Sequence, residues 1–193
     1  NEAGLGSAPI AHAASKNEDP MVEGINASLG VFIDTIIICT MTALVILTSG
    51  LVSIESNGAM VIEGNLKGAT LTTAAFHTLL PGVGGYIISV GLIFFAFSTI
   101  LGWYYYGSKC VEYIAGLKAV NYYSWAWIIL TFVGATTSLE TVWNLSDVFN
   151  GLMIIPNVIG IIGLSPLILK TTKDYDRKIK VEKGKVREQL TTP

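Results

Sequence analysis

The chain has 193 residues, of which 51% are hydrophobic and only 13% are charged, and its mean hydropathy is +0.58. Soluble globular domains carry about 25% charged residues, so roughly half of the usual solubilising charge is missing. The net charge of −2 leaves no basic surface with which to hold phosphates, and this excludes a nucleic-acid binder. The composition predicts a membrane protein embedded in a lipid bilayer.

The first predicted element is a short helix that begins after Ser7. Ser7 is a capping residue type and Pro9 lies within the first turn, and both features favour a helix start. The apolar run 8–14 is too short to cross a bilayer. It is either the second half of a broken helix or a surface helix exposed by truncation. Because the sequence opens at Asn1 without an initiator Met, we expect it to be the C-terminal part of a longer polypeptide.

Four longer apolar segments follow, and each approaches or exceeds the roughly 20 residues that a membrane helix needs. They are 29–52, 79–106, 122–139 and 148–169. The first contains one charged residue, Asp34, and the other three contain none. A short helix that does not cross the membrane is predicted over 70–76, with Thr70 as its capping residue. The sequence therefore predicts one partial and four complete membrane helices.

Lysine and arginine residues indicate the orientation of these helices. Lys16, Lys109, Lys118 and the eight basic residues of segment 170–193 fall on one side of the predicted bilayer, and Lys67 falls on the other. Connections on the cytoplasmic side are enriched in such residues, so the C-terminus is predicted to be cytoplasmic. Residues 1–169 then form the transmembrane region, and 170–193 form a charged cytoplasmic tail.

The apolar segments offer no set of converging catalytic groups. Asp34 is their one carboxylate, and no metal-binding histidine motif, nucleophile elbow or phosphate-binding glycine loop is present. We therefore predict neither enzyme activity nor a cofactor.

Two groups of residues instead have features of a transport site. Gly4 and Gly6 let the backbone leave helical geometry, and the half-helix after them would offer N–H groups to a substrate carboxylate. Short glycine-rich stretches are, however, also common in ordinary loops. Ser98 and Thr99 supply two neutral oxygens near the middle of an uncharged segment, which suits Na⁺. Alternatively, both hydroxyls bond back to carbonyls one turn earlier, as often happens in membrane helices.

Four motifs in residues 1–169 resemble the alanine/glycine:cation symporter family. In chain order they are NEAGLGSAPIAHAA at 1–14, FIDTIIICT at 32–40, FFAFSTILGWYYYG at 94–107 and WNLSDVFNGLMIIPN at 143–157. Four motifs in the same order make the resemblance specific.

The resemblance implies symport of alanine or glycine with Na⁺, or in some members H⁺, by alternating access across the inner (plasma) membrane. It also implies an all-α fold of the leucine-transporter type, in which two five-helix repeats have inverted topology and the first and sixth core helices are broken. The chain would be the second repeat alone. The missing N-terminal half of the same polypeptide would hold the rest of both binding sites, so this chain alone should not transport.

The resemblance also implies roles for the first residues of the chain. Asn1, Glu2, Gly4, Gly6 and Ser7 would lie at the unwound stretch of the sixth core helix, where the carboxylate and amine of the substrate are bound. The two glycines would keep this pocket small, and Ser7 would cap the half-helix.

The other implied site residues lie on later helices. Ser98 and Thr99 would bind Na⁺ on the eighth helix, and Trp103 would either close the substrate pocket or serve in packing. Asp34 and Thr35 would form either a structural hydrogen-bonded pair or part of the intracellular gate. Two other functions stay open: a symporter for another neutral amino acid, and a non-transporting membrane receptor or assembly module on the same scaffold.

Overall fold

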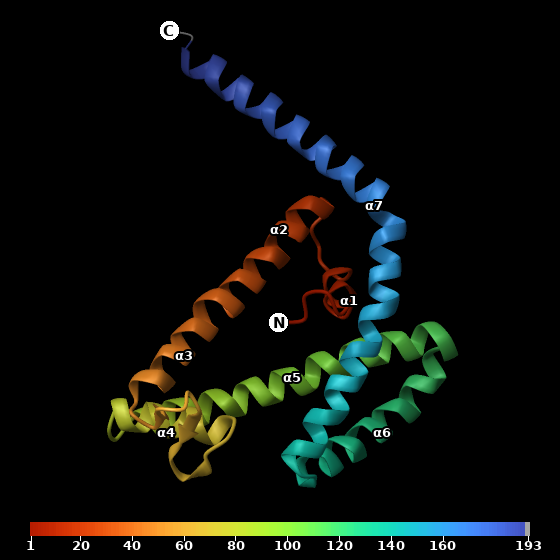
Figure 1. Ribbon diagram of the computed structural model, residues 1–193. Coiled ribbons are helices and arrows are strands. Elements are labelled where there is room, and N and C mark those ends of the chain that lie inside the picture. Colours follow the sequence, from red (N-terminus) through yellow and green to blue (C-terminus); the bar gives the residue numbers. More distant parts are fainter. Residues whose placement is uncertain (192–193) are drawn as a thin grey trace. The chain divides into compact units, whose positions relative to one another are not determined.

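The computed structural model describes residues 1–191, with side chains described as far as residue 184. The described chain is mostly helical (Figure 1). Its elements are α1 (Ala8–His12), α2 (Pro20–Val31), the π-helix η1 (Phe32–Ile38), α3 (Cys39–Thr48), the strands β1 (Val52–Ile54) and β2 (Met60–Ile62), the 3₁₀ helix η2 (Glu63–Asn65), α4 (Ala69–Leu79), α5 (Gly84–Ala115), α6 (Leu117–Thr136) and α7 (Leu139–Thr191). The predicted all-α architecture is thus confirmed, apart from one short hairpin.

Three helical stretches of the described chain are long and apolar enough to cross a membrane. They are Pro20–Thr48, Gly84–Ala115 and Leu139–Gly184. Almost none of their residues is buried within the chain. Helices that expose apolar side chains all round need lipid or further protein as their surroundings. The described helices are therefore those of a multi-pass membrane protein.

The prediction of four complete spans is met only in part. The segment predicted over 122–139 does form a helix, but this helix is α6, which begins at Leu117 and ends at Thr136. Its 20 residues would be long enough to cross a bilayer. It is less apolar than the other three because its first turns contain Lys118, Asn121 and several tyrosine, serine and tryptophan residues.

The last predicted span also differs in its limits. Instead of ending near residue 169, α7 continues as helix to Thr191, so the described part of the predicted tail is helical. Pro156 and Pro166 lie inside α7, and each removes one donor from its hydrogen-bond ladder. The helix changes direction along its course, as expected of a helix that contains prolines (Figure 1). Residues 192–193 of the predicted tail lie outside the described residues.

The chain divides into two compact units, and the first comprises Asn1 and Gly30–Val133. After α3 the chain forms an antiparallel hairpin of β1 and β2 and then the helix α4, which packs on α3 and α5. The short helix predicted over 70–76 is confirmed as α4. However, the cap position is Gly68, and Thr70 lies inside the first turn, where its hydroxyl donates to the carbonyl of Lys67 at 2.7 Å.

Aromatic side chains join α5 to α6 in the same unit. The Tyr104 ring stacks on Tyr123 with a centroid distance of 5.8 Å, and the Tyr104 hydroxyl lies 2.7 Å from that of Ser124. The tilted ring of Trp127 contacts both tyrosines. Gly107 makes this approach possible, because a Cβ atom there would lie 1.9 Å from the Tyr123 hydroxyl oxygen.

The second unit comprises Glu2–Leu29 and the chain from Gly134 onward. Two side-chain contacts join the C-terminal half of α7 to the start of α2 and to the residue before it. The Thr172 hydroxyl lies 3.5 Å from the sulfur of Met21, and the Lys178 ammonium lies 3.7 Å from the Asp19 carboxylate. Helix α1 is joined to α2 by His12 Nδ1, which lies 2.6 Å from a Glu23 carboxylate oxygen.

The packing of α5 on α6 can be tested at Gly107. We expect Gly107→Ala to lower the free energy of unfolding in detergent by about 1–3 kcal/mol, because the new methyl group overlaps Tyr123. Gly91→Ala is the matched control on α5, since a Cβ there meets nothing within 4 Å. It should leave stability unchanged or raise it by up to about 1 kcal/mol through helix propensity. Equal thermal-unfolding temperatures for the two variants would contradict this packing.

Candidate functional site

Residues 2–6 are non-helical and lie immediately before Ser7 and α1. Gly4 and Gly6 have φ angles of +86° and +87°, in the left-handed region that side-chain-bearing residues avoid. The Leu5 N–H donates to the Glu2 carbonyl at 3.1 Å, which closes a tight turn. Helix α1 then begins at Ala8, with Pro9 as its second residue. The two glycines therefore lie in non-helical backbone, as their sequence pattern predicted.

One side chain of α7 holds this interrupted backbone. The Asn157 amide nitrogen Nδ2 donates to the Gly4 carbonyl oxygen at 2.8 Å, across 153 positions of sequence. The same side chain packs against Gly6, where a Cβ atom would lie 3.0 Å from Asn157 Cβ and 3.1 Å from Cγ and Oδ1. Figure 1 shows the N-terminal segment beside α7. Residues 4–6 and Asn157 therefore form one packed group.

Ser7 does not cap α1 in the predicted way. Its hydroxyl donates to Glu2 Oε2 at 2.7 Å, and no hydrogen bond joins it to the N–H groups of the helix. The reason is its backbone: at φ −80° and ψ −45° Ser7 is already helical, whereas a capping serine needs an extended conformation to reach the second or third N–H. Ser7 is 1% exposed and Glu2 is half-buried, so this bond with the carboxylate is partly buried. It joins the two ends of the turn.

Asp34 and Thr35 lie in the π-helix η1, which interrupts the helical stretch that runs from Pro20 to Thr48. In this segment the Cys39 N–H donates to the Asp34 carbonyl, five residues earlier. Such π segments are uncommon and recur at functional sites. The Thr35 hydroxyl accepts a hydrogen bond from the Asn1 side-chain amide, and both residues belong to the first unit.

The predicted Na⁺ ligands lie on α5 in the first unit. The Ser98 hydroxyl donates to the Phe95 carbonyl at 3.1 Å, as expected of a serine that bonds back along its own helix. This bond uses the proton of the hydroxyl and leaves lone pairs on its oxygen. Thr99 is exposed on α5, and the Trp103 ring makes an edge contact with Tyr106 at a centroid distance of 5.7 Å.

The predicted site residues thus fall into two groups, one in each unit. Glu2, Gly4, Gly6 and Ser7 lie together in the second unit, where Asn157 joins them. The first unit contains the others: Asn1, Asp34, Thr35, Ser98, Thr99 and Trp103. Within the described residues, no three His, Cys, Asp or Glu side chains are placed to hold a metal ion.

Sequence reasoning gave Asn157 no role. In the sequence it stands out only as the last residue of a family motif. The available signal was its position beside Pro156 in the uncharged segment 148–169, because an amide at membrane depth must find a hydrogen-bond partner. The partner itself lies at the opposite end of the chain and has no side chain, so no pattern in the sequence identifies it.

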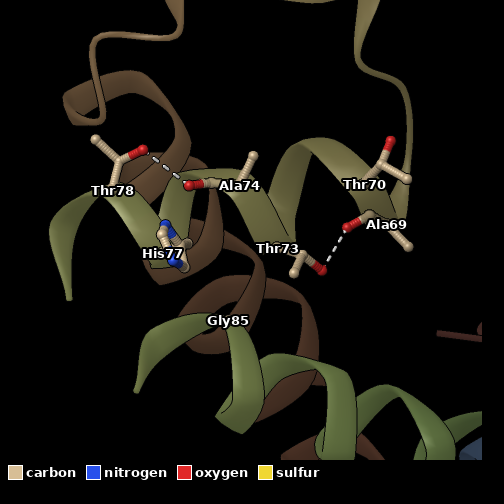
Figure 2. Close-up of a pocket in the computed structure, with 7 residues that line it drawn as sticks. All are labelled: Ala69, Thr70, Thr73, Ala74, His77, Thr78 and Gly85. Atoms are coloured by element: carbon tan, nitrogen blue, oxygen red, sulfur yellow. Dashed lines mark hydrogen bonds between the residues drawn. The ribbon is translucent and has the colours of Figure 1, made fainter. Parts of the chain in front are cut away.

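A surface hollow of about 520 Å³ lies between α4 and α5. Figure 2 shows His77 on the side of α4 that faces Gly85 of α5, with threonines along the same helix. The hydroxyls of Thr73 and Thr78 donate to carbonyls of their own helix at 2.8 and 2.9 Å. The hollow is therefore lined by small side chains and by hydroxyls already bonded to α4, and none of the predicted site residues lines it.

The sequence model of the sodium:alanine symporter family matches residues 1–189. The chain is similar to the sodium/alanine symporter AgcS of Methanococcus maripaludis, with 47% identity over 91% of this chain and 37% of the relative. It is also similar to an uncharacterized transporter of Haemophilus influenzae, with 44% identity over 94% of this chain and 38% of the relative. The amino-acid carrier protein AlsT of Bacillus subtilis is 38% identical over 93% of this chain and 37% of the relative.

The chain spans a little over a third of the length of these relatives. No solved structure matches it. The family match covers nearly the whole chain and includes the glycine turn, η1, α5 and α7. The chain therefore belongs to the sodium:alanine symporter family.

Proposed function

We propose that this chain is part of a Na⁺-coupled symporter for alanine or glycine that works by alternating access. The observation that carries the proposal is the interrupted backbone at Gly4 and Gly6, held by Asn157 in a multi-pass membrane protein of this family. At membrane depth, non-helical backbone is tolerated only where it is buried in protein or lines a cavity. Secondary transporters bind substrate and ion at such discontinuous helices.

In this proposal the substrate lies against the turn of residues 1–7. Peptide N–H and C=O groups freed from helical bonding bind the carboxylate and ammonium of the amino acid, together with Asn1 and Glu2. The Glu2 carboxylate accepts one hydrogen bond from Ser7 and keeps lone pairs for an ammonium donor. Gly4 and Gly6 bring no side chain into the pocket, which suits a substrate as small as alanine. The family resemblance adds Trp103 of α5, either as a residue of the substrate pocket or in packing.

Na⁺ is held in this proposal by the hydroxyl oxygens of Ser98 and Thr99, with main-chain carbonyls and residues outside this chain completing its ligands. Na⁺ binding stabilises the conformation that binds the amino acid, so each ligand raises the affinity for the other by the same factor. Asp34 and Thr35 in η1 form part of the intracellular gate, where a π segment can absorb a change in helix geometry.

The chain provides the second, inverted repeat of a leucine-transporter-type fold in this proposal. Its C-terminus lies in the cytoplasm, where lysine and arginine residues concentrate, and the plasma membrane surrounds its helices. The first repeat comes from another part of the same polypeptide. The support for this arrangement is that the chain spans a little over a third of its relatives. We call the polypeptide with both repeats the intact transporter.

The proposal predicts that proteoliposomes of the intact transporter accumulate radiolabelled alanine when Na⁺ is more concentrated outside. Without the gradient, alanine should only equilibrate. Accumulation driven by a proton gradient alone would indicate that H⁺, and not Na⁺, is the coupling ion. Unlabelled glycine should compete with alanine for uptake. Stronger competition by a larger neutral amino acid would indicate that this amino acid is the preferred substrate.

Two outcomes contradict the proposal more deeply. Tight alanine binding without flux under any gradient would indicate a receptor or assembly module on the same scaffold. Neither binding nor flux would exclude alanine as the ligand of the glycine turn. This chain reconstituted without the first repeat should show no uptake, and this preparation serves as the negative control.

The Na⁺ assignment has its own test in the intact transporter. We expect Ser98→Ala or Thr99→Ala to raise the Na⁺ concentration for half-maximal uptake about tenfold, which corresponds to the loss of roughly 1.4 kcal/mol of binding. Ser165→Ala is the matched control, because Ser165 donates to the Ile162 carbonyl on α7 as Ser98 does to Phe95 on α5. If the Na⁺ dependence of both α5 variants equals that of the control, these residues are not Na⁺ ligands.

A further inference from the structure

We infer that Asn157 is a positioning residue of the substrate site, and that its amide fixes the backbone turn of Gly4–Gly6 in the geometry that binds the amino acid. The inference rests on the proposed function, because it assigns Asn157 to the site formed by that turn. It concerns a residue on α7 that does not itself touch the substrate.

The first argument is the hydrogen bond of the Gly4 carbonyl. At φ +86° Gly4 is outside helical geometry, so its carbonyl oxygen must find a donor elsewhere. Asn157 Nδ2 supplies one at 2.8 Å. An unsatisfied carbonyl in hydrocarbon is strongly disfavoured. This donor therefore favours the turn over a helical alternative at the same place.

The second argument is the fit between Asn157 and Gly6. Three Asn157 atoms lie 3.0–3.1 Å from the place where a Cβ of Gly6 would be, so the side chain fills the space beside that glycine. The turn thus has a hydrogen bond on Gly4 and a packing contact on Gly6 from one side chain. A backbone held at two residues has less freedom to rearrange, and a preformed site binds its ligand more tightly.

The orientation of the amide follows from chemistry. If Oδ1 faced the Gly4 carbonyl, two acceptors would oppose each other, so the nitrogen must take that position. A carboxylate of the same shape has no donor at neutral pH. Asn157→Asp therefore preserves the packing against Gly6 and replaces the hydrogen bond by repulsion, whereas Asn157→Ala removes both contacts and introduces no charge.

This difference distinguishes positioning from mere packing. If Asn157 only filled space, the isosteric Asp variant would be milder than the Ala variant. If its amide positions the turn, Asp is the more damaging change. Asn144→Asp is the matched control, because it makes the same substitution on α7 at an exposed site thirteen residues earlier.

The test measures alanine uptake by the intact transporter in proteoliposomes with equal amounts of reconstituted protein. We expect Asn157→Asp to raise KM for alanine about tenfold or more and Asn157→Ala to raise it less, since a lost hydrogen bond to an ordered partner costs about one tenfold step in affinity. Vmax should change less than KM. An unchanged KM for Asn157→Asp, or a larger effect of Asn157→Ala, would overturn the inference.

A second measurement does not depend on transport. Hydrogen–deuterium exchange of peptides covering residues 2–8 should be faster in Asn157→Asp than in the wild type, and unchanged in Asn144→Asp. Equal exchange in all three proteins would overturn the inference even if uptake were altered. If exchange responds as expected but the wild type takes up no alanine, the turn is positioned by Asn157 and the proposed function is what fails.

Discussion

The structure depends on one requirement: non-helical backbone inside a membrane protein must still satisfy its hydrogen bonds. The turn at Gly4 and Gly6 meets this requirement through Asn157, whose side-chain amide donates to the Gly4 carbonyl. The bond of Ser7 to Glu2 closes the same turn internally. Together these contacts let a non-helical stretch persist beside α7. A conformation of this kind exposes peptide groups that an ordinary helix would bury in its own hydrogen-bond ladder.

The rest of the described chain has little core of its own. Ala75 is its one fully buried hydrophobic residue, and the large apolar side chains of α2, α5 and α7 are mostly exposed. Local contacts such as the stack of Tyr104 on Tyr123 join neighbouring helices. The apolar surfaces that remain exposed need lipid or further protein to cover them. This agrees with a chain that spans a little over a third of the length of its relatives.

Hydropathy and glycine chemistry predicted the helices and the break at residues 4–6, because both follow from local composition. The positions where helices begin and end were less predictable. Helix α7 continues past residue 169 because its charged continuation still favours helix, and α6 starts at Leu117. The π geometry around Asp34 and the pairing of Ser7 with Glu2 depend on backbone angles that composition does not specify. Asn157 was missed for a different reason. Its partner is a backbone carbonyl 153 positions away, and only the fold brings the two together.

The most direct test of the central claim places a probe between the two glycines. In an intact transporter whose native cysteines are replaced, Leu5→Cys would be labelled with a small thiol reagent, and Asn57→Cys in the β1–β2 hairpin turn would serve as control. If the turn forms the substrate site of a Na⁺-coupled symporter, alanine should slow labelling at position 5 only when Na⁺ is present, and should leave position 57 unaffected. Labelling at position 5 that ignores alanine in Na⁺ would contradict the account.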